Sequence, residues 1–532
     1  MPLRDFSWAA IIPLMVTDKD SRDLLRSIDT ARLALHDDFR PEAVEKQRRR
    51  AAMTARERVA YLCDPGSFTE IGGLVRDEGL SRPAPADGVI TGTGRIDGRW
   101  AVIVSQDFTV YGGSSGKLGS AKIRRAGLQA LKQGLPLVML LDGGGHRIQD
   151  GQDSRHFAHA GDHFHNLARM SGWVPMVAAM LGAGFAGPTN YAGMADFVVM
   201  VRGQSTMGLA GPALVKAGTG EDATTEALGG AAMQVDRYGL ADLGVESEQA
   251  ALDAVRRFLS YLPSNARQDL PRVTCDDPAD RRDDVLLDLV PANTRKAYDV
   301  RRVIATIADN DSVFEIKPTY AGNLVTSFAR LAGRPVGFVA NQPMRLGGML
   351  DSPACEKGAH FIALCDAFGV PLIHLVDVPG FSIGSPAERT MLGRRSAKLI
   401  HELGHATVPR ITVVLRKGYG LGYYAMSGGR SFDADACLGW PTAEICAMSI
   451  EGSVDVAFRR DYQDAPDPMA RRQELIDGMR ANVTSQRAAE GFGVDDIIDP
   501  RDTRRILIDV LDRVPARRDN AMPPKYRSIV PI

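Results

Sequence analysis

The stretch GLPLVMLLDGGG, residues 134–145, recurs later in the chain as GVPLIHLVDVPG, residues 369–380. Pro136 matches Pro371 and Asp142 matches Asp377, and both pairs lie 235 positions apart. The same spacing relates further pairs on either side of this stretch: Gly98 and Gly333, Gly112 and Gly347, Lys122 and Lys357, and Gly187 and Gly422. A period this long indicates a duplicated domain, because solenoid repeats span only about 20–50 residues.

The two copies share one pattern of expected elements. An extended apolar segment, residues 100–104 or 336–340, precedes a glycine-rich turn. In the first copy, residues 120–133 follow with apolar side chains at helical spacing, and a second buried strand leads into another glycine-rich turn. This alternation predicts a layered α/β architecture in both halves.

The chain is long enough for more than one domain. Its 532 residues exceed what one ordinary core supports. We expect domains at 1–275 and 276–532, joined within 262–284, where Pro, Asp and Arg replace the apolar periodicity. Ahead of the repeat, residues 18–62 are typical of a charged amphipathic helix, which either packs against a neighbour or caps the first domain.

The composition is that of a globular enzyme. The net charge of −1 favours neither nucleic acid nor a membrane surface as a partner. The apolar run 8–16 is too short to span a bilayer and lacks the cleavage signal of a secretory leader. Six cysteines without a C-x-x-C pair argue against a zinc ribbon and against a disulfide framework, so we expect a cytoplasmic protein.

Glycine-rich turns are the main candidates for a functional site. Gly143, Gly144 and Gly145 fit neither the phosphate-binding P-loop nor the dinucleotide fingerprint. A second turn follows a strand in each half, at 181–188 and at 416–423. If a helix starts at Pro188, the amides before it are unpaired and can hold an oxyanion. The alternative is that these glycines only permit tight packing between strand and helix.

Side-chain catalysts are scarce in this sequence. It has no H-E-x-x-H motif, no G-x-S-x-G elbow, and no cysteine in a known nucleophile context. A reaction in which backbone amides stabilise an enolate, with the base supplied by substrate or cofactor, suits such a chain.

Several longer stretches resemble a known family. They are TARERVAYLCDPGSF (54–68), SQDFTVYGGS (105–114), GGHRIQDG (144–151), LLDLVPA (286–292), EKGAHFIALCDAFGVPLIHLVDVPGF (356–381) and ATVPRITVVLRKGYG (406–420). Their order along the chain resembles that of the carboxyltransferase (beta) subunit of biotin-dependent acyl-CoA carboxylases, of the propionyl-CoA carboxylase type. The resemblance covers nearly the whole chain from about residue 54.

The resemblance implies a fold, an assembly and a reaction. It implies two tandem crotonase-like (ClpP/crotonase) domains, six subunits arranged as a trimer of dimers, and an active site between the first domain of one subunit and the second domain of another. A separate biotin carboxylase and biotin carboxyl carrier partner would bring carboxybiotin, and acyl-CoA would be the substrate. The biotin anion would remove the α-proton, and the resulting enolate would take up the carbon dioxide.

The resemblance also assigns roles to residues. Those implied on the acyl-CoA side are the amides of Ala186 and Gly187, for the enolate oxygen, and the pocket-lining turn Gly143, Gly144, Gly145 and His146. Those implied on the biotin side are the amides of Leu421 and Gly422, for the ureido oxygen, with Tyr419 and Gly420 beside them. Tyr424 would border the acyl group. The chain departs from the family at these turns, reading GGGHR at 143–147 where relatives commonly have SGGAR, and YGLGY at 419–423 where they have YGGAY.

A cluster of histidines stands outside this pattern. Five of the ten histidines fall within twenty residues: His146, His156, His159, His163 and His165. If the segment is one helix, three of them share a face at a spacing that suits zinc, although no carboxylate or cysteine ligand is clearly placed. We favour histidines that line the substrate pocket, and we expect no metal in this subunit. The matched lysines Lys122 and Lys357 are expected on helix surfaces, with binding of CoA phosphates as the alternative.

Three functions fit these observations. The first is a carboxyltransferase subunit that adds a carboxyl group to the α-carbon of a short acyl-CoA, of propionyl-CoA or acetyl-CoA type. The second keeps the fold and reverses the chemistry, as a decarboxylase or transcarboxylase acting on a substrate of malonyl-CoA type. The third is a non-catalytic subunit that keeps the hexamer.

Overall fold

The computed structural model describes residues 20–77, 79–80, 84–158, 161–429, 434–517 and 529. Within these residues the strands form one large sheet in each half of the chain and a two-stranded sheet of β6 (Ala183–Phe185) and β8 (Thr206–Gly208). The first large sheet has the order β1 (Thr69–Ile71), β2 (Val89–Ile96), β3 (Arg99–Gln106), β4 (Leu137–Leu141), β5 (Met176–Met180), β7 (Phe197–Val201), β9 (Leu243–Val245).

The second large sheet repeats this order. It consists of β10 (Phe314–Ile316), β11 (Leu324–Leu331), β12 (Arg334–Asn341), β13 (Leu372–Val378), β14 (Arg410–Tyr419), β15 (Ala436–Gly439) and β17 (Asp496–Ile497), with β16 (Glu444–Cys446) pairing to β14. In each sheet the first three strands are antiparallel and the later strands are parallel.

The duplication holds residue by residue. Strand β2 corresponds to β11 and strand β3 to β12, and the first and last residues of each pair lie 235 positions apart. The same holds for the helices that follow them, α4 (Lys117–Gln133) and α14 (Ser352–Phe368). Both helices end at a glycine in the left-handed region, Gly134 at φ 64° and Gly369 at φ 78°. A glycine adopts this conformation without the steric cost that a side chain adds, so both helices end at the same point.

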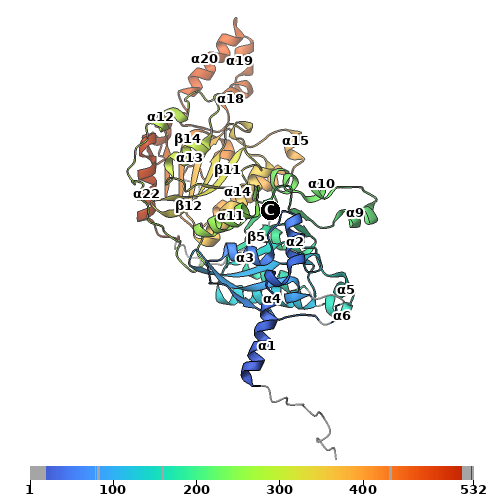
Figure 1. Cartoon of the computed structure of the whole chain (residues 1–532). Coiled ribbons are helices and arrows are strands. Elements are labelled where there is room, and N and C mark those ends of the chain that lie inside the picture. The colour runs from blue at the N-terminus through green and yellow to red at the C-terminus, as the bar shows by residue number, and fades with distance from the viewer. Residues whose placement is uncertain are drawn as a thin grey trace, which may run out of the picture.

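The remaining helices cover the sheets and extend from them (Figure 1). Those of the N-terminal half are α1 (Ser21–Leu33), α2 (Pro41–Arg49), α3 (Ala55–Leu62), α5 (Ile148–Gly151), α6 (Ser154–Phe157), α7 (Asp162–Met170), α8 (Gly187–Gly193), α9 (Pro212–Thr219), α10 (Thr225–Gly229) and α11 (Glu248–Tyr261). Those of the C-terminal half are α12 (Val285–Leu289), α13 (Val300–Ile307), α15 (Ser385–Glu388), α16 (Leu392–His405), α17 (Gly420–Ala425), α18 (Ile450–Ala457), α19 (Arg459–Gln463), α20 (Pro468–Arg480), α21 (Ser485–Glu490) and α22 (Thr503–Arg513).

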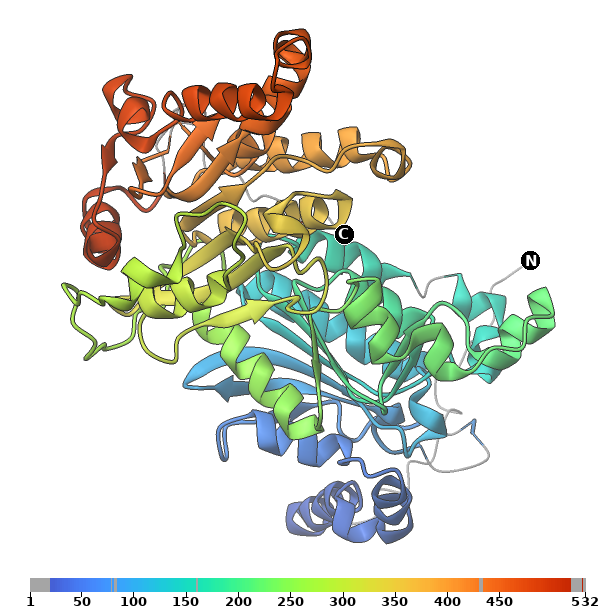
Figure 2. The same cartoon turned by 90° about the horizontal axis from the view of Figure 1, so that it is seen from above.

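The two halves share a core. Helix α11 packs on β5 and β7, and its Phe258 stacks on Phe197 with ring centroids 4.6 Å apart. Phe258 also contacts the second sheet, because its ring centroid lies 5.9 Å from that of Phe328 in β11. A buried ion pair of 3.0 Å between Lys317 and Asp242 also joins the halves. Figure 2 shows the halves against each other, with the blue N-terminal helices and the red C-terminal helices at opposite ends.

Two segments outside the sheets bear on the expected organisation. The predicted linker 262–284 contains no helix or strand, because α11 ends at Tyr261 and α12 begins at Val285. The single helix expected over 18–62 is wrong: the described part of this segment forms α1, α2 and α3. Pro41 starts α2, and Thr54 starts α3 through a capping box with Glu57. Among the described residues no helix has the length and apolarity needed to cross a membrane.

Candidate active site

The opening turn after β4 is built on a contact between two glycines. A Cβ atom at Gly143 would lie 2.1 Å from the carbonyl oxygen of Gly113, so the two backbones meet where no side chain fits. A Cβ at Gly144 would meet nothing within 4 Å. Gly143 therefore closes the turn, whereas Gly144 leaves open space beside it.

The matched aspartates hold these turns in place. Asp142 is fully buried and pairs with Arg50 at 3.0 Å and with Arg58 at 2.9 Å. In the other half Asp377 is also buried and pairs with Arg416 at 2.9 Å. Buried carboxylates require such partners, because leaving them unpaired costs several kcal/mol, roughly 3–5. We therefore assign both aspartates to the architecture of the turns.

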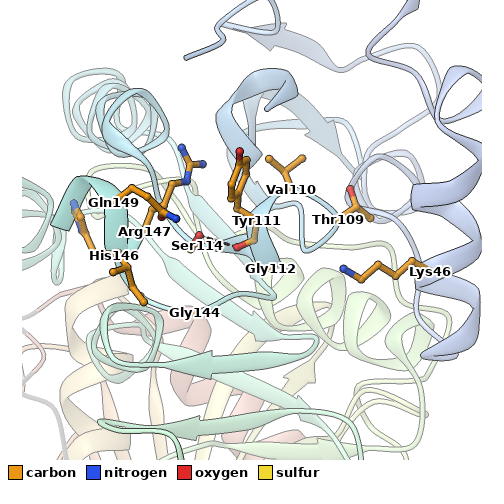
Figure 3. Close-up of a pocket in the computed structure, with 12 residues that line it drawn as sticks. Lys46, Thr109, Val110, Tyr111, Gly112, Ser114, Gly144, His146, Arg147 and Gln149 are labelled. Atoms are coloured by element: carbon orange, nitrogen blue, oxygen red, sulfur yellow. Dashed lines mark hydrogen bonds between the residues drawn. The ribbon is translucent and has the colours of Figure 1, made fainter. Parts of the chain in front are cut away.

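A pocket of about 590 Å³ opens beside the first turn (Figure 3). Gly144, Gly145 and His146 line it, with Lys46 reaching in from α2 on the opposite side. Arg147 is also at the pocket, but its guanidinium group is buried and pairs with Asp87 at 2.7 Å. The exposed ammonium group of Lys46 is therefore the cation that is better placed to meet an anionic ligand.

The second turn of the N-terminal half leads from β6 into α8. Ala186 has φ 63° and ψ −121°, a strained conformation for a residue with a side chain. Its amide donates to the Gly208 carbonyl at 2.8 Å, so the amide that we expected at the enolate oxygen already has an acceptor. The next amide, of Gly187, lies 3.8 Å from the Cβ position of Gly145, which brings the two turns together.

The matching turn of the C-terminal half leads from β14 into α17. Gly420 has φ 58°, and the Tyr419 hydroxyl donates to Glu444 at 2.6 Å, so this side chain points into the protein. Leu421 is 55 % exposed, while Gly422 is buried with its Cβ position 2.9 Å from the Cα of Gly380.

Three of the four expected amides are unpaired. Among the described residues, no hydrogen bond joins the amides of Gly187, Leu421 or Gly422 to an acceptor outside their helices. As residues of a first helical turn they have no acceptor within the helix either. These donors suit an anionic or strongly polarised oxygen. Tyr424, expected at the acyl group, is 43 % exposed near this turn.

The histidine segment is not one helix. It divides into α6 and α7, with Gly161 immediately before α7. His159 and the side chain of His156 lie outside the described residues. His163 is buried against Tyr191, with ring centroids 4.8 Å apart, and His165 is exposed. The described residues contain no group of three or more histidine, cysteine, aspartate or glutamate side chains able to hold a metal ion, so the zinc alternative gains no ligand set.

The expectation of surface lysines in the repeat is wrong. Lys122 is 7 % exposed and Lys357 is 1 % exposed. The ammonium group of Lys122 donates to the carbonyls of Ala86 and Val89, and burial lowers its pKa to about 8. Burial also lowers the pKa of Lys357 to about 7. Helical spacing does not show which helix face the rest of the chain covers, so the sequence pattern missed this burial.

Some pocket residues had no clear signal in the sequence. Lys46 and Tyr111 reach the pocket from segments more than thirty positions before the opening turn, and only the tertiary fold brings them there. Tyr191 was detectable, because it follows Gly187 by four positions and so lies one helical turn further along α8.

The fold and the site define the class of enzyme. The family described as "Carboxyl transferase domain" matches residues 46–528, and the chain belongs to this carboxyltransferase family. The family resemblance expected from the sequence is thereby confirmed.

Individual relatives give the same result. The chain is 39 % identical over 496 residues to the methylmalonyl-CoA decarboxylase subunit alpha of Propionigenium modestum, covering 92 % of this chain and 95 % of that protein. It is 39 % identical over 497 residues to the propionyl-CoA carboxylase carboxyltransferase subunit of Haloferax mediterranei, covering 92 % and 96 %.

A solved structure supports the fold. The transcarboxylase 12S structure described as a hexamer, with methylmalonyl-coenzyme A and methylmalonic acid bound, is similar to this chain with a TM-score of 0.89. It is 38 % identical and covers 96 % of this chain and 98 % of that one. The expected α/β fold of tandem crotonase-like domains is confirmed.

Proposed function

We propose that this chain is a carboxyltransferase subunit that moves a carboxyl group between biotin on a partner subunit and the α-carbon of a short-chain acyl-CoA. The observation that carries this proposal is the set of unpaired amides at Gly187, Leu421 and Gly422. They stand at matched turns of the two repeats, each at the start of a helix.

The N-terminal half binds the acyl-CoA. The thioester oxygen lies at the Gly187 amide, between the opening turn and α8, and the CoA portion extends along the pocket lined by Gly144, Gly145 and His146. Lys46 meets a phosphate of the CoA. When the α-proton leaves, negative charge moves onto the thioester oxygen, and the Gly187 amide stabilises it more in the transition state than in the ground state. Because the Ala186 amide is already bonded, Gly187 replaces the expected pair as the main donor.

The C-terminal half binds the biotin group. The amides of Leu421 and Gly422 fit its ureido oxygen, because both donors lack other acceptors and adjoin one exposed turn. When bound, carboxybiotin supplies the carboxyl group and the base that accepts the α-proton. The role of this turn is to orient the ring and stabilise charge on its oxygen. The Tyr419 side chain takes no direct part, since its hydroxyl group is bonded to Glu444.

The proposed site is completed by a second copy of the chain. The pocket at the first turn is lined only by residues of the N-terminal half. In the proposed homohexamer, arranged as a trimer of dimers, this half lies opposite the C-terminal half of another copy; the 12S relative is itself described as a hexamer. The biotin reaches the site on a separate biotin carboxylase and biotin carboxyl carrier partner.

The same amides serve the reverse reaction, as a decarboxylase or transcarboxylase on a substrate of malonyl-CoA type. The relative from Propionigenium modestum, named as a methylmalonyl-CoA decarboxylase subunit, favours keeping this second candidate. A non-catalytic hexamer subunit is less well supported, because the altered side chains of the turns leave the amide donors free.

The test is transfer of labelled carboxyl groups from malonyl-CoA and methylmalonyl-CoA to free biotin by the purified chain. We expect transfer from one of these donors, and its identity gives the acyl group. A full-length homohexamer that binds both CoA thioester and biotin but transfers no label, even with biotinylated carrier, would contradict the proposal. Transfer to water without a biotin requirement would favour a biotin-independent decarboxylase instead.

A further inference from the structure

A second, smaller pocket lies behind the first, between α4, α7 and α8. Its volume is about 190 Å³, and His146, His163, Tyr191 and Arg124 are among the residues that line it. Sites for whole ligands usually span about 300–1,000 Å³, so this pocket suits a part of a ligand. His146 lines both pockets, so the two are neighbours at this side chain.

His163 is the unusual residue of this smaller pocket. It is 4 % exposed, and both of its ring nitrogens lack a hydrogen-bond partner among the described residues. One side of the ring packs against the backbone of α4, where a Cβ at Gly127 would lie 3.1 Å from Nδ1. The edge-to-face contact with Tyr191 satisfies neither nitrogen. A buried imidazole without partners is costly, and a ligand that bonded to it would offset this cost.

The imidazole presents a neutral surface to the pocket. Burial lowers the pKa of His163 to about 4, so at neutral pH one nitrogen donates a hydrogen bond and the other accepts one. The nearby charge of Arg124 is compensated by Asp162 at 3.0 Å. Lys117 also lines the pocket, but at His163 itself the pocket suits an uncharged polar group.

One wall of the pocket, Tyr191, lies beside the proposed thioester site. The Cβ position of Gly187 lies 3.7 Å from the hydroxyl oxygen of Tyr191, so an acyl chain whose oxygen meets the Gly187 amide starts beside this tyrosine. An acyl chain that passes Tyr191 next meets His163, because the two rings are in contact and both line the pocket.

We infer that His163 and Tyr191 select an acyl-CoA whose acyl chain carries an uncharged oxygen substituent, a hydroxyl or keto group, and that the smaller pocket receives this chain. The inference rests on the proposed function, because it takes the Gly187 amide as the thioester site. His163 and Tyr191 act as specificity-determining residues, binding the substituent and leaving the chemistry at the α-carbon to the backbone amides.

The experiment measures binding by the full chain of two matched thioesters, butyryl-CoA and 3-hydroxybutyryl-CoA, by calorimetry at pH 7.5, with CoA itself as a reference. We expect the hydroxylated thioester to bind about tenfold more tightly, the contribution of roughly one good hydrogen bond. H163L should abolish this preference, Y191F should reduce it, and neither should change the affinity for CoA. H165L is the matched control, since His165 is an exposed histidine on the same helix, and it should retain the preference.

Two results would overturn the inference. One is equal affinity of the unaltered chain for both thioesters, and this result needs no variant to fold. The other is a preference that persists in both H163L and Y191F. In either case normal binding of CoA and butyryl-CoA would leave the proposed function standing, whereas loss of binding for every CoA compound would count against both.

Discussion

Lys122 and Lys357 stand 235 positions apart, and both bury their ammonium groups against backbone carbonyls of the segment before the second strand of their sheet. Lys122 donates to Ala86 at 3.0 Å, and Lys357 donates to Lys317 at 2.8 Å and to Tyr320 at 2.9 Å. Each lysine thus ties its helix, α4 or α14, to the loop that enters the antiparallel part of the sheet. This shared contact makes the lysines part of the fold.

The first prediction concerns these lysines. K122M should lower the free energy of unfolding by about 2 kcal/mol, because it leaves buried carbonyl oxygens without a donor. K357M should have a similar effect. Chemical denaturation measures the loss, and calorimetry should show unchanged affinity for CoA. A K122M chain of normal stability that no longer binds CoA would instead support the role in binding CoA phosphates.

The second prediction concerns the opening turn. G143A should destabilise the protein by about 3 kcal/mol or more, because the added Cβ would lie 2.1 Å from the Gly113 carbonyl oxygen and backbone atoms cannot move aside cheaply. G144A is the matched control, and its unfolding temperature should stay close to that of the unaltered chain, since its Cβ meets open space. Equal stability of the two variants would show that the Gly113 and Gly143 backbones do not meet as described.

The third prediction separates backbone from side chain at the turn before α17. L421P removes the amide hydrogen while keeping a residue that the first turn of a helix tolerates, and it should lower the carboxyl-transfer rate about 100-fold. L421A should retain nearly full activity, because the side chain is exposed and the amide remains. Similar circular dichroism spectra would establish that both variants fold. Full activity in L421P would remove this amide from the mechanism.

The fourth prediction concerns acid stability. Burial lowers the pKa of His163 to about 4 and, together with Arg410, lowers that of His374 to about 3. An unfolded histidine has a pKa of about 6.5, so between these values the unfolded chain binds more protons and stability falls as the pH falls. Each histidine should cost about 2 kcal/mol at pH 5 relative to pH 7.5.

The measurement for this fourth prediction is urea unfolding at the two pH values. H374L should reduce the loss of stability between pH 7.5 and pH 5, because it removes one of the buried titrating groups. H405L is the control, since it removes an exposed histidine instead of a buried one. An H374L chain with the same acid sensitivity as the unaltered chain would show that His374 is not the cause.

Much of the fold could be predicted from the sequence, because its signals are local or repeated. The spacing of 235 between Pro136 and Pro371 predicted a duplication, and the two sheets and the helices α4 and α14 obey it. The glycine-rich turns were also detectable, since a buried strand that ends in consecutive glycines indicates a close approach of backbones. Gly143 and Gly113 confirm that approach.

The candidate site was predictable only in part. The positions of Gly187 and Leu421 followed from the family resemblance, but the bond from the Ala186 amide to Gly208 did not, because it joins segments whose separation the sequence does not reveal. The shared face considered for the histidine cluster depended on a helix whose continuity the sequence does not fix. Its spacing assumed one helix, whereas Gly161 separates α6 from α7.

The sequence by itself determined the duplicated α/β architecture, the family and the places where amides are free of side chains, because these depend on periodicity and on residue types within a few turns of chain. Only the tertiary structure decided which of those amides lack acceptors, that Lys122 and Lys357 are buried, and that His163 faces Tyr191 at the end of a pocket. Burial and hydrogen-bond partnership depend on which distant segments pack together, and that is a property of the whole fold.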